Sequence, residues 1–487
     1  MNIISPSGTE GYESDPEIMG VTSNSKEVNT GFLFAALLGS NFDGAQFISE
    51  AIARGAVAIL INVSSDILSK PMIVHTISTD NPRRLFALIS AKIHGKQPDF
   101  IAAVTGTNGK TSVVEFARQL WEMNGVNSAS LGTLGVIAKN LELQSELTSP
   151  DPVSLHTNLN ALSENGVTNL AIEASSHGLD QSRLDGVSIQ SAAFTNLSQD
   201  HLDYHVDQAS YFSSKARLFS ELLVETGVAV LNADSPYFSE LRNICNGRKI
   251  SISSYGHSEY ATMRVLSVTP YLSGQHVVLK VNDVVFQIHL ALIGEFQLFN
   301  ALAALGLVSA EQGLGIEDYL ESLDKIKGVP GRLEHIGTHP TGASIVVDYA
   351  HTPDALKNIL LSLRPHVKGK LVCVFGAGGD RDKEKRPLMG KVASILADIT
   401  IVTDDNPRSE SPLAIREEIM KGCPSAQNVG ERSEAIRLGL SKLSDGDLLI
   451  IAGKGHETGQ EIGGATIPFN DAAFVSTQLN DVVGRAP

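Results

Sequence analysis

The stretch FIAAVTGTNGKTSVVEFARQLWEMNG, residues 100–125, decides the fold. It begins with a short apolar run that is typical of a buried strand, continues through a glycine-rich turn, and ends in a segment with helical spacing of apolar residues. A strand, a phosphate-type loop and a helix in this order are characteristic of a nucleotide-binding α/β domain.

The turn TGTNGKTS carries groups that suit a phosphate. Gly106 and Gly109 allow close approach of the backbone, Lys110 supplies a cation, and Thr111 offers a hydroxyl for Mg²⁺ at a helix N-terminus. A full Walker A motif would require glycine where Val104 stands, so the loop is a shortened one. A plain Gly-Asn turn is the alternative. Because of the flanking strand and helix we expect phosphate binding.

Short apolar runs alternate with helical patterns along the rest of the chain, which indicates α/β domains with parallel sheets. In the middle of the chain, runs that end in polar residues are predicted to be strands at 170–174, 192–196 and 228–232. The last third repeats the arrangement with SIVVDYAH, KLVCVFGAGGDRD, ITIVTDDNPR and DLLIIAGKGHE. Ligands of open α/β sheets bind at the carboxyl ends of strands, so the chemistry is expected there.

The composition excludes several classes of protein. The chain has 487 residues, of which 42% are apolar and 19% charged, as in a globular protein of two to four domains. The formal net charge is −16 without a basic run, which argues against nucleic acid as the main partner. The three cysteines lack metal-site or disulfide spacing. We see neither a membrane span nor the pattern of a signal peptide, and expect a cytoplasmic monomer.

Two breaks in the pattern suggest three domains. The polar segment HGKQPD precedes the nucleotide-binding strand, and GVPGR at 328–332 interrupts a helical segment before a new strand. The predicted domains are residues 1–97, 98–332 and 333–487.

Several residues at strand ends are candidates for chemistry. Glu173 follows an apolar strand and could bind Mg²⁺. A Ser/His dyad at Ser175 is a competing interpretation, but no G-x-S-x-G elbow surrounds it. His201 and Asp203 suit a metal or base, although a surface histidine is commoner. Composition alone predicts a solvated helix lysine at Lys215.

Two later loops each hold an arginine after an apolar run: Arg381 in GAGGDRD and Arg408 in DNPR. A guanidinium fixed in this way suits bidentate recognition of a carboxylate or phosphate, and a solvated arginine is the alternative for either loop alone.

Taken together and in order, eight motifs closely resemble the Mur ligase family, within it the members that add diaminopimelate. They are TGTNGKTS, EASSHGLDQSRLDG, TNLSQDHLDYH with Lys215, GRLE, VDYAHTPDAL, GAGGDRDKEKRPLMG, DDNPR and GKGHE. The resemblance implies a UDP-substrate-binding domain, a central ATP-binding domain and a Rossmann-like C-terminal domain for the amino acid. It also implies peptidoglycan precursor synthesis: ATP phosphorylates the D-Glu carboxylate of UDP-N-acetylmuramoyl-L-Ala-D-Glu, and meso-2,6-diaminopimelate attacks the acyl-phosphate.

The resemblance assigns roles residue by residue. The ATP site would comprise Gly106, Thr107, Asn108, Gly109, Lys110, Thr111, Ser112, Asn300, Arg332 and Asp348. Mg²⁺ would be held by Thr111, Glu173, His201 and Lys215, the last as a carbamate (N6-carboxylysine); Lys110, Glu173, His201 and Lys215 would be catalytic. The UDP substrate would contact Ser25, Ser40, Asn41, Phe42, Thr148, Ser149, Ser175, Gln181 and Arg183. Diaminopimelate would contact Arg381, Asp405, Asn406, Pro407, Arg408, Gly453 and Glu457.

Specificity for the amino acid can be argued physically. Diaminopimelate differs from lysine by a second carboxylate. An enzyme can require that carboxylate by presenting an arginine, here Arg408, whose guanidinium would be left unpaired if lysine were bound. Lysine-adding relatives lack this arginine, and Ser411 stands where an acidic residue is common, with an expected effect on loop packing. The alternatives are a lysine-adding or other Mur ligase, a folylpolyglutamate synthase-like ligase, or a non-enzymatic nucleotide-binding module.

Overall fold

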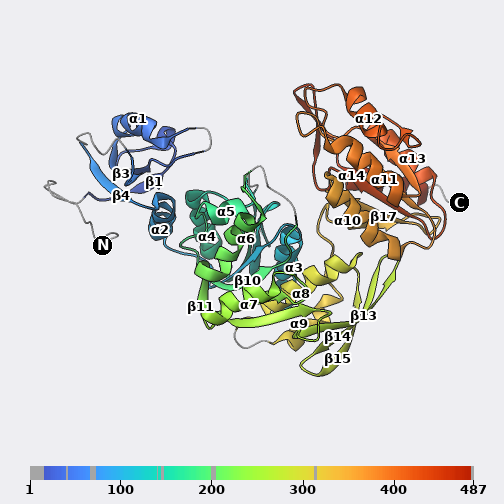
Figure 1. Ribbon diagram of the computed structural model, residues 1–487, viewed down its shortest axis with the longest axis horizontal. Coiled ribbons are helices and arrows are strands. Elements are labelled where there is room, and N and C mark those ends of the chain that lie inside the picture. Colours follow the sequence, from blue (N-terminus) through green and yellow to red (C-terminus); the bar gives the residue numbers. More distant parts are fainter. Residues whose placement is uncertain are drawn as a thin grey trace. The chain divides into compact units, whose positions relative to one another are not determined.

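The computed structural model describes residues 16–39, 42–65, 73–139, 141–143, 147–198, 204–311 and 315–483. The chain divides into two compact units, and Figure 1 labels their elements. The first unit is residues 1–254 with 303–315, and the second unit is residues 255–302 with 316–487. The three domain limits expected from the sequence remain a prediction.

The first unit begins with a four-stranded parallel sheet of order β1-β2-β3-β4. Alternate residues face opposite sides, so Phe34 and Ile59 pack on α1 while Leu33 and Leu60 pack on α2. The elements are β1 (Gly20–Thr22), β2 (Phe32–Ala35), α1 (Ile48–Ala53), β3 (Ala56–Asn62), β4 (His75–Thr79) and α2 (Pro82–His94).

The larger sheet of the first unit has the order β11-β10-β5-β9-β6-β7-β8. Its strands from β11 to β6 are parallel, as the sequence predicts, and β7 and β8 continue it as antiparallel neighbours. The strands are β5 (Phe100–Thr105), β6 (Ser128–Gly132), β7 (Gly135–Ala138), β8 (Leu141–Leu143), β9 (Asn169–Glu173), β10 (Ile189–Phe194) and β11 (Leu223–Asn232). The helices are α3 (Lys110–Met123), α4 (Pro152–Glu164), α5 (Ser176–Asp180), α6 (Gln208–Arg217) and α7 (Phe238–Gly247).

The chain passes from the first unit to the second along β12 (Ser251–Gly256) and returns along α8 (Glu295–Val308). Between them lies an antiparallel group of three strands, β13 (Met263–Tyr271), β14 (Gly274–Val281) and β15 (Val284–Leu290). Helix α9 (Ile316–Leu323) packs against β15.

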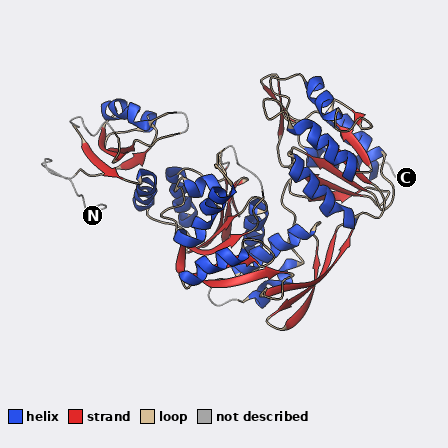
Figure 2. Ribbon diagram, in the orientation of Figure 1, coloured by secondary structure: helices blue, strands red, loops and turns tan. Residues whose placement is uncertain are grey.

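The main sheet of the second unit has the order β16-β17-β21-β18-β19-β20 and is parallel apart from β16. Helices cover both faces (Figure 2): residues of α10, α11 and α12 share one core, and residues of α13 and α14 share the other. This is the predicted Rossmann-like arrangement. The strands are β16 (Glu334–Thr338), β17 (Ser344–Asp348), β18 (Leu371–Phe375), β19 (Ile399–Val402), β20 (Gln427–Asn428), β21 (Leu448–Ala452) and the hairpin β22 (Gly459–Ile462) and β23 (Ala465–Pro468). The helices are α10 (Pro353–Leu363), α11 (Lys385–Leu396), α12 (Pro412–Met420), α13 (Arg432–Ser441) and α14 (Asp471–Val483).

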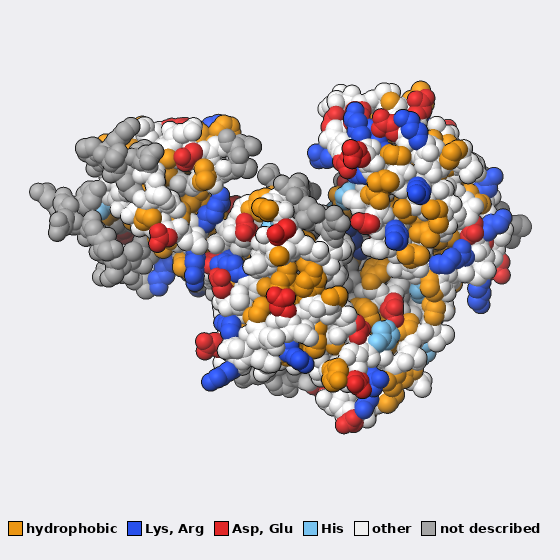
Figure 3. All heavy atoms as spheres, viewed as in Figure 1, with side chains coloured by type: hydrophobic (Ala, Val, Ile, Leu, Met, Phe, Trp, Pro, Cys, Tyr) orange, Lys and Arg blue, Asp and Glu red, His pale blue; other side chains and the backbone are white. Residues whose placement is uncertain are grey.

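The surface is not dominated by one sign of charge on the face shown in Figure 3, where basic and acidic side chains are interspersed. All three cysteines are buried as free thiols. None of the helices in the described ranges has the length and apolar character that a membrane span requires. Because neither sign of charge dominates the face shown in Figure 3, anionic ligands must be bound by individual cations and N–H groups at their sites.

Candidate active site

The loop between β5 and α3 is held by the end of the neighbouring strand β10. Gly106 has φ +147°, and a Cβ on it would lie 1.9 Å from Oγ1 of Thr195, so no larger residue fits. The N–H of Thr107 donates to the carbonyl of Asn196 at 2.9 Å, and the N–H of Asn108 donates to the Asn196 side chain at 3.0 Å. The loop is thereby fixed before the first turn of α3, whose N–H groups lack partners within the helix.

Two lysines converge on this loop. Nζ of Lys110 donates to the carbonyls of Gly106 and Thr107 at 2.9 and 2.8 Å. Lys215, on α6, is 1% exposed, and its Nζ donates to the same Gly106 carbonyl at 2.8 Å. The solvated position that composition predicts for Lys215 is wrong, because α6 packs its last turn against the loop and also places the amine 4.5 Å from the Tyr211 ring.

Tyr211 is a residue that sequence reasoning missed. Its hydroxyl lies 3.2 Å from Oγ1 of Thr107, and its ring is 1% exposed. It precedes Lys215 by one helical turn, so the i, i+4 spacing is the signal that would have placed both residues on one face of α6.

The carboxylate of Glu173 lies at the carboxyl end of β9, next to β5, and is 1% exposed. Its Oε1 accepts from the N–H of Thr133 at 2.8 Å, and its Oε2 accepts from the Thr133 hydroxyl at 3.3 Å. Thr133 follows the end of β6 and was not predicted. From the sequence, the only indication of this region was the expectation that the carboxyl ends of neighbouring parallel strands lie together.

The described donors fit Mg²⁺ in kind, since Glu173 and Thr111 both offer oxygen. His201 lies outside the described residues. Within the described ranges, no group of three or more His, Cys, Asp or Glu side chains converges. An anionic Lys215 carbamate would add oxygen donors, whereas the free ammonium would repel a metal ion.

A polar cluster continues from Glu173 and contains the residues expected at the UDP substrate. Oγ of Ser149 donates to the Glu173 carbonyl at 2.9 Å and accepts from the N–H of Ser175 at 3.0 Å. The guanidinium of Arg183 donates to the Ser149 carbonyl at 2.7 Å and to the side chain of Gln181. Thr148 joins through its hydroxyl, which lies 3.1 Å from that of Thr133.

Ser175 is the N-cap residue of α5, because its Oγ accepts from the N–H of Gly178. The dyad interpretation of Ser175 gains no support from this contact. In the N-terminal sheet region, Ser25 is buried and donates to Glu50 at 2.8 Å, while Phe42 is exposed. Ser40 and Asn41 lie outside the described residues.

In the second unit, the loops after β19 and β21 bring the residues expected at diaminopimelate together. Oδ1 of Asp405 accepts from the N–H of Asn406, and its buried Oδ2 has no hydrogen-bond partner among the described residues. Gly453 has φ +117°, and a Cβ there would lie 2.5 Å from that Oδ2. The glycine therefore keeps open a buried acceptor that suits an ammonium group.

Arg408 lies beside this acceptor loop in a left-handed conformation, with φ 51°. Its side chain donates to the Gly379 carbonyl at 2.8 Å and forms an ion pair with Glu461 at 2.7 Å. Pro407 packs near Gly379, where an added Cβ would lie 2.0 Å from the Pro407 carbonyl oxygen. Arg381 is exposed in the loop after β18.

Arg386, which the sequence did not single out, fixes the position of these loops. It is fully buried and donates to both oxygens of Glu410 and to Glu418. Glu410 in turn accepts from the N–H of Asp380, whose carboxylate accepts from Ser409. The hydrogen bonds from Arg386 lower the pKa of Glu410 to about 2. The signal lay within the motif GAGGDRDKEKRPLMG, but nothing in it marks this basic residue as buried.

Lys454 in GKGHE, which was likewise not predicted, is also fully buried. Its Nζ donates to Oδ1 of Asn406 at 3.0 Å, to Oε2 of Glu457 at 2.8 Å and to the Gly459 carbonyl at 2.6 Å.

Three other residues expected at the ATP site, Asn300, Arg332 and Asp348, lie within the second unit. Gln297 accepts from Asn300 at 3.0 Å and donates to the Arg332 carbonyl at 2.9 Å. The guanidinium of Arg332 lies 4.9 Å from the Tyr349 ring centroid. Asp348 accepts from the N–H groups of Leu333 and Ala350, and burial raises its pKa.

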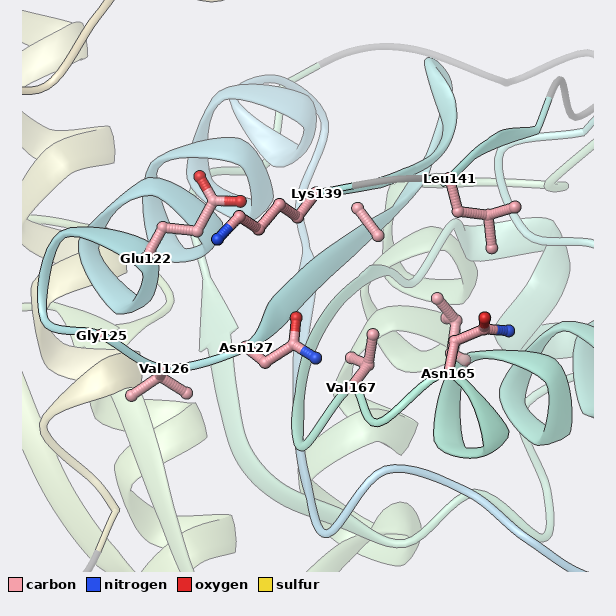
Figure 4. Close-up of a pocket in the computed structure, with 10 residues that line it drawn as sticks. Glu122, Gly125, Val126, Asn127, Lys139, Leu141, Asn165 and Val167 are labelled. Atoms are coloured by element: carbon pink, nitrogen blue, oxygen red, sulfur yellow. The ribbon is translucent and has the colours of Figure 1, made fainter.

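A cavity of about 560 Å³ lies elsewhere in the first unit, at the amino ends of β6 and β9 (Figure 4). Glu122, Asn127, Lys139 and Asn165 line it together with apolar side chains. No residue expected to bind substrate lines this cavity, which belongs to the edge of the sheet away from the phosphate loop.

Comparison with known proteins identifies relatives along almost the whole chain. Three family descriptions match: "Mur ligase family, catalytic domain" at 17–92, "Mur ligase middle domain" at 104–308 and "Mur ligase, glutamate ligase domain" at 331–455. UDP-N-acetylmuramoyl-L-alanyl-D-glutamate–2,6-diaminopimelate ligase of Brucella melitensis is 45% identical over 478 residues, covering 96% of this chain and 95% of the relative. A solved structure of a ligase with that name is 32% identical, with a TM-score of 0.73, and covers 96% of this chain and 95% of its own. Folylpolyglutamate synthase of Mycobacterium tuberculosis, solved with ADP and AMPPCP, shares the fold at 20% identity, with a TM-score of 0.62 and coverage of 83% and 95%.

Proposed function

The chain belongs to the Mur ligase family, and from this we propose that it joins meso-2,6-diaminopimelate to the D-Glu of UDP-N-acetylmuramoyl-L-Ala-D-Glu with hydrolysis of ATP. The product is a precursor of peptidoglycan. The observation that carries the amino-acid assignment is the cluster of Asp405, Arg408 and Gly453, which offers a buried acceptor for an ammonium group beside a fixed guanidinium.

The first step activates a carboxylate, which is a poor electrophile. An oxygen of the D-Glu carboxylate forms a bond to the γ-phosphorus of ATP, the bond to the β-phosphate oxygen breaks, and ADP leaves. Two anions must approach each other, so fixed cations and N–H groups offset the repulsion. Lys110 and the first turn of α3 supply them in the first unit.

The second step forms the amide. The uncharged amine of diaminopimelate attacks the acyl-phosphate carbon, inorganic phosphate leaves with the bonding electron pair, and the amine loses a proton. Arg183 and Ser149 suit the anionic and polar groups of the UDP-linked peptide. Asp405 and Glu457 suit the distal ammonium of the amino acid, and Arg408 suits its carboxylate.

By the resemblance, Mg²⁺ would be held by Thr111, Glu173, His201 and a carbamate on Lys215, and when bound it would screen the phosphate charges. One observation supports the carbamate: Lys215 is buried, and burial favours the uncharged amine, which is the form that combines with CO₂. We expect ¹³C NMR at neutral pH with ¹³C-labelled bicarbonate to detect a carbamate on Lys215, and Lys215→Arg to abolish its signal. An unmodified lysine under these conditions would remove the carbamate from the mechanism.

The decisive experiment measures phosphate release with ATP, Mg²⁺ and UDP-N-acetylmuramoyl-L-Ala-D-Glu, comparing meso-diaminopimelate with L-lysine. We expect release that depends on diaminopimelate. Equal use of lysine would favour the lysine-adding alternative, and activity with a folate instead of the UDP-peptide would favour the folylpolyglutamate synthase alternative. ATP binding without amino-acid-dependent release would favour a regulatory module.

A further inference from the structure

We propose that Lys454 is a positioning residue for the amino acid substrate: it acts through Asn406 and Glu457, and so sets the charge and the orientation of the ammonium-binding side of the second-unit site. The inference rests on the proposed function, since it concerns how the same amino acid is recognised.

All three N–H donors of the Lys454 ammonium group are used in hydrogen bonds. An ammonium group has three N–H donors, and Lys454 directs one to each of three acceptors. Asn406 lies in the loop after β19, whereas Glu457 and Gly459 follow Lys454 within the stretch from β21 to the start of β22. A buried ammonium is stable only when paired and hydrogen-bonded, so Lys454 holds the loop after β19 against its own loop.

The consequence for Asn406 is a fixed amide orientation. Its Oδ1 accepts from Lys454 and from the N–H of Glu461 at 3.0 Å, so the Nδ2 group must point the other way. There it donates to Oε2 of Glu457 at 2.9 Å. The two neighbours of Lys454 are therefore also bonded to each other.

The consequence for Glu457 is that its two oxygens differ. Oε2 accepts from both Lys454 and Asn406, while no hydrogen bond from the described residues reaches Oε1. The side chain is 31% exposed. Lys454 thus presents one carboxylate oxygen to an incoming ammonium and offsets the negative charge that Glu457 would otherwise add to buried Asp405.

The test compares Lys454→Met with Ile436→Ala, a buried core position on α13 that contacts none of these groups through polar atoms. At saturating ATP and UDP-peptide we expect Lys454→Met to raise KM for diaminopimelate by about tenfold or more, the loss of a charged hydrogen bond. KM for ATP and for the UDP-peptide should stay within about twofold. Ile436→Ala should lower the melting temperature without this selective rise.

A double-mutant cycle separates positioning from general destabilisation. If Lys454 acts through Asn406, the pair Lys454→Met with Asn406→Ala should raise KM little more than the worse single variant. Additive effects, or an equal rise of all three KM values, would overturn the inference. Lys454→Gln retains two donors and serves as the second variant if Lys454→Met fails to fold; an unchanged KM for diaminopimelate in a folded Lys454→Gln would also overturn it. A wild-type protein without diaminopimelate-dependent phosphate release would instead overturn the proposed function.

Discussion

The loop between β5 and α3 in the first unit and the cluster of Asp405, Arg408 and Gly453 in the second unit (the amino-acid cluster) are both held in fixed positions. The contacts that hold them differ in kind. The phosphate loop is built from backbone geometry, with Gly106 pressed against Thr195 and with loop N–H groups donating to Asn196. The amino-acid cluster is built from buried ions, with Arg386 and Lys454 fully enclosed and each donating to carboxylates. Substitutions in the loop should therefore affect chemistry, whereas substitutions of the buried ions should affect recognition and stability.

The largest effect expected is the loss of activity in Lys110→Met. The amine contributes charge to the phosphoryl-transfer step, so we predict a fall in kcat of about 10³-fold. The melting temperature should change little, because Lys110 donates to the neutral carbonyls of Gly106 and Thr107 within its own loop. Phosphate-release kinetics and thermal melting measure the two effects. Lys92→Met, an exposed position on α2, is the control, and a loss under about tenfold would contradict the role.

For Arg432→Met in the second unit we expect a large loss of stability, in contrast to the large loss of kcat expected for Lys110→Met. The guanidinium of Arg432 is 1% exposed and pairs with both oxygens of Asp471, which is fully buried. Removing it leaves a buried carboxylate without its cation, so the free energy of unfolding should fall by about 3 kcal/mol.

Denaturant unfolding measures the Arg432 effect, with exposed Arg437→Met on the same helix as the control. Because Arg432 also donates to the carbonyls of Asp404 and Ala452, KM for diaminopimelate should rise while KM for ATP stays near that of the wild type. A loss of stability no larger than that of Arg437→Met would contradict the comparison between the two regions.

A smaller, pH-dependent effect is expected at Glu410. Its pKa in the fold is about 2, below the ordinary 4.5, chiefly because Arg386 donates to it. The carboxylate therefore stabilises the fold above pH 4.5, and that stabilisation is lost as the pH falls from 4.5 toward 2. Glu410→Gln should be less stable than the wild type above pH 4.5, and the difference should shrink through that window. Exposed Glu417→Gln on α12 is the control, and a difference that does not vary with pH would exclude the pairing as its cause.

The same contrast explains what could be predicted from the sequence. The parallel strands β5, β9, β10 and β11 and the phosphate loop follow from local spacing, because a buried strand and a glycine-rich turn are encoded within a few residues. The antiparallel strands β7, β8 and β13 to β15 were not predicted. Arg386, Lys454 and Thr133 could not be found this way, because burial of a polar side chain depends on contacts between distant segments. Lys215 shows the limit: composition places it in solvent, and only the resemblance to a family predicts a role for it beside the phosphate loop. The structure shows it buried, with its amine donating to the Gly106 carbonyl.

The smallest effect concerns Ser411, the N-cap residue of α12. Its side chain makes no capping hydrogen bond, whereas Thr352, the N-cap residue of α10, accepts from the N–H of Ala355 at 3.3 Å. Ser411→Ala should therefore change the free energy of unfolding by less than about 0.5 kcal/mol, and Thr352→Ala should cost about 1 kcal/mol. Ser411→Asp should raise the free energy of unfolding by about 0.5 kcal/mol, because a negative charge at a helix N-terminus interacts favourably with the helix dipole. Denaturant unfolding of the three variants measures the order. If Ser411→Ala instead lowered the free energy of unfolding as much as Thr352→Ala does, the loop that carries Arg408 would be stabilised by this N-cap as well as by the buried ions. The difference between a phosphate loop held by backbone contacts and an amino-acid cluster held by buried ions would then be smaller.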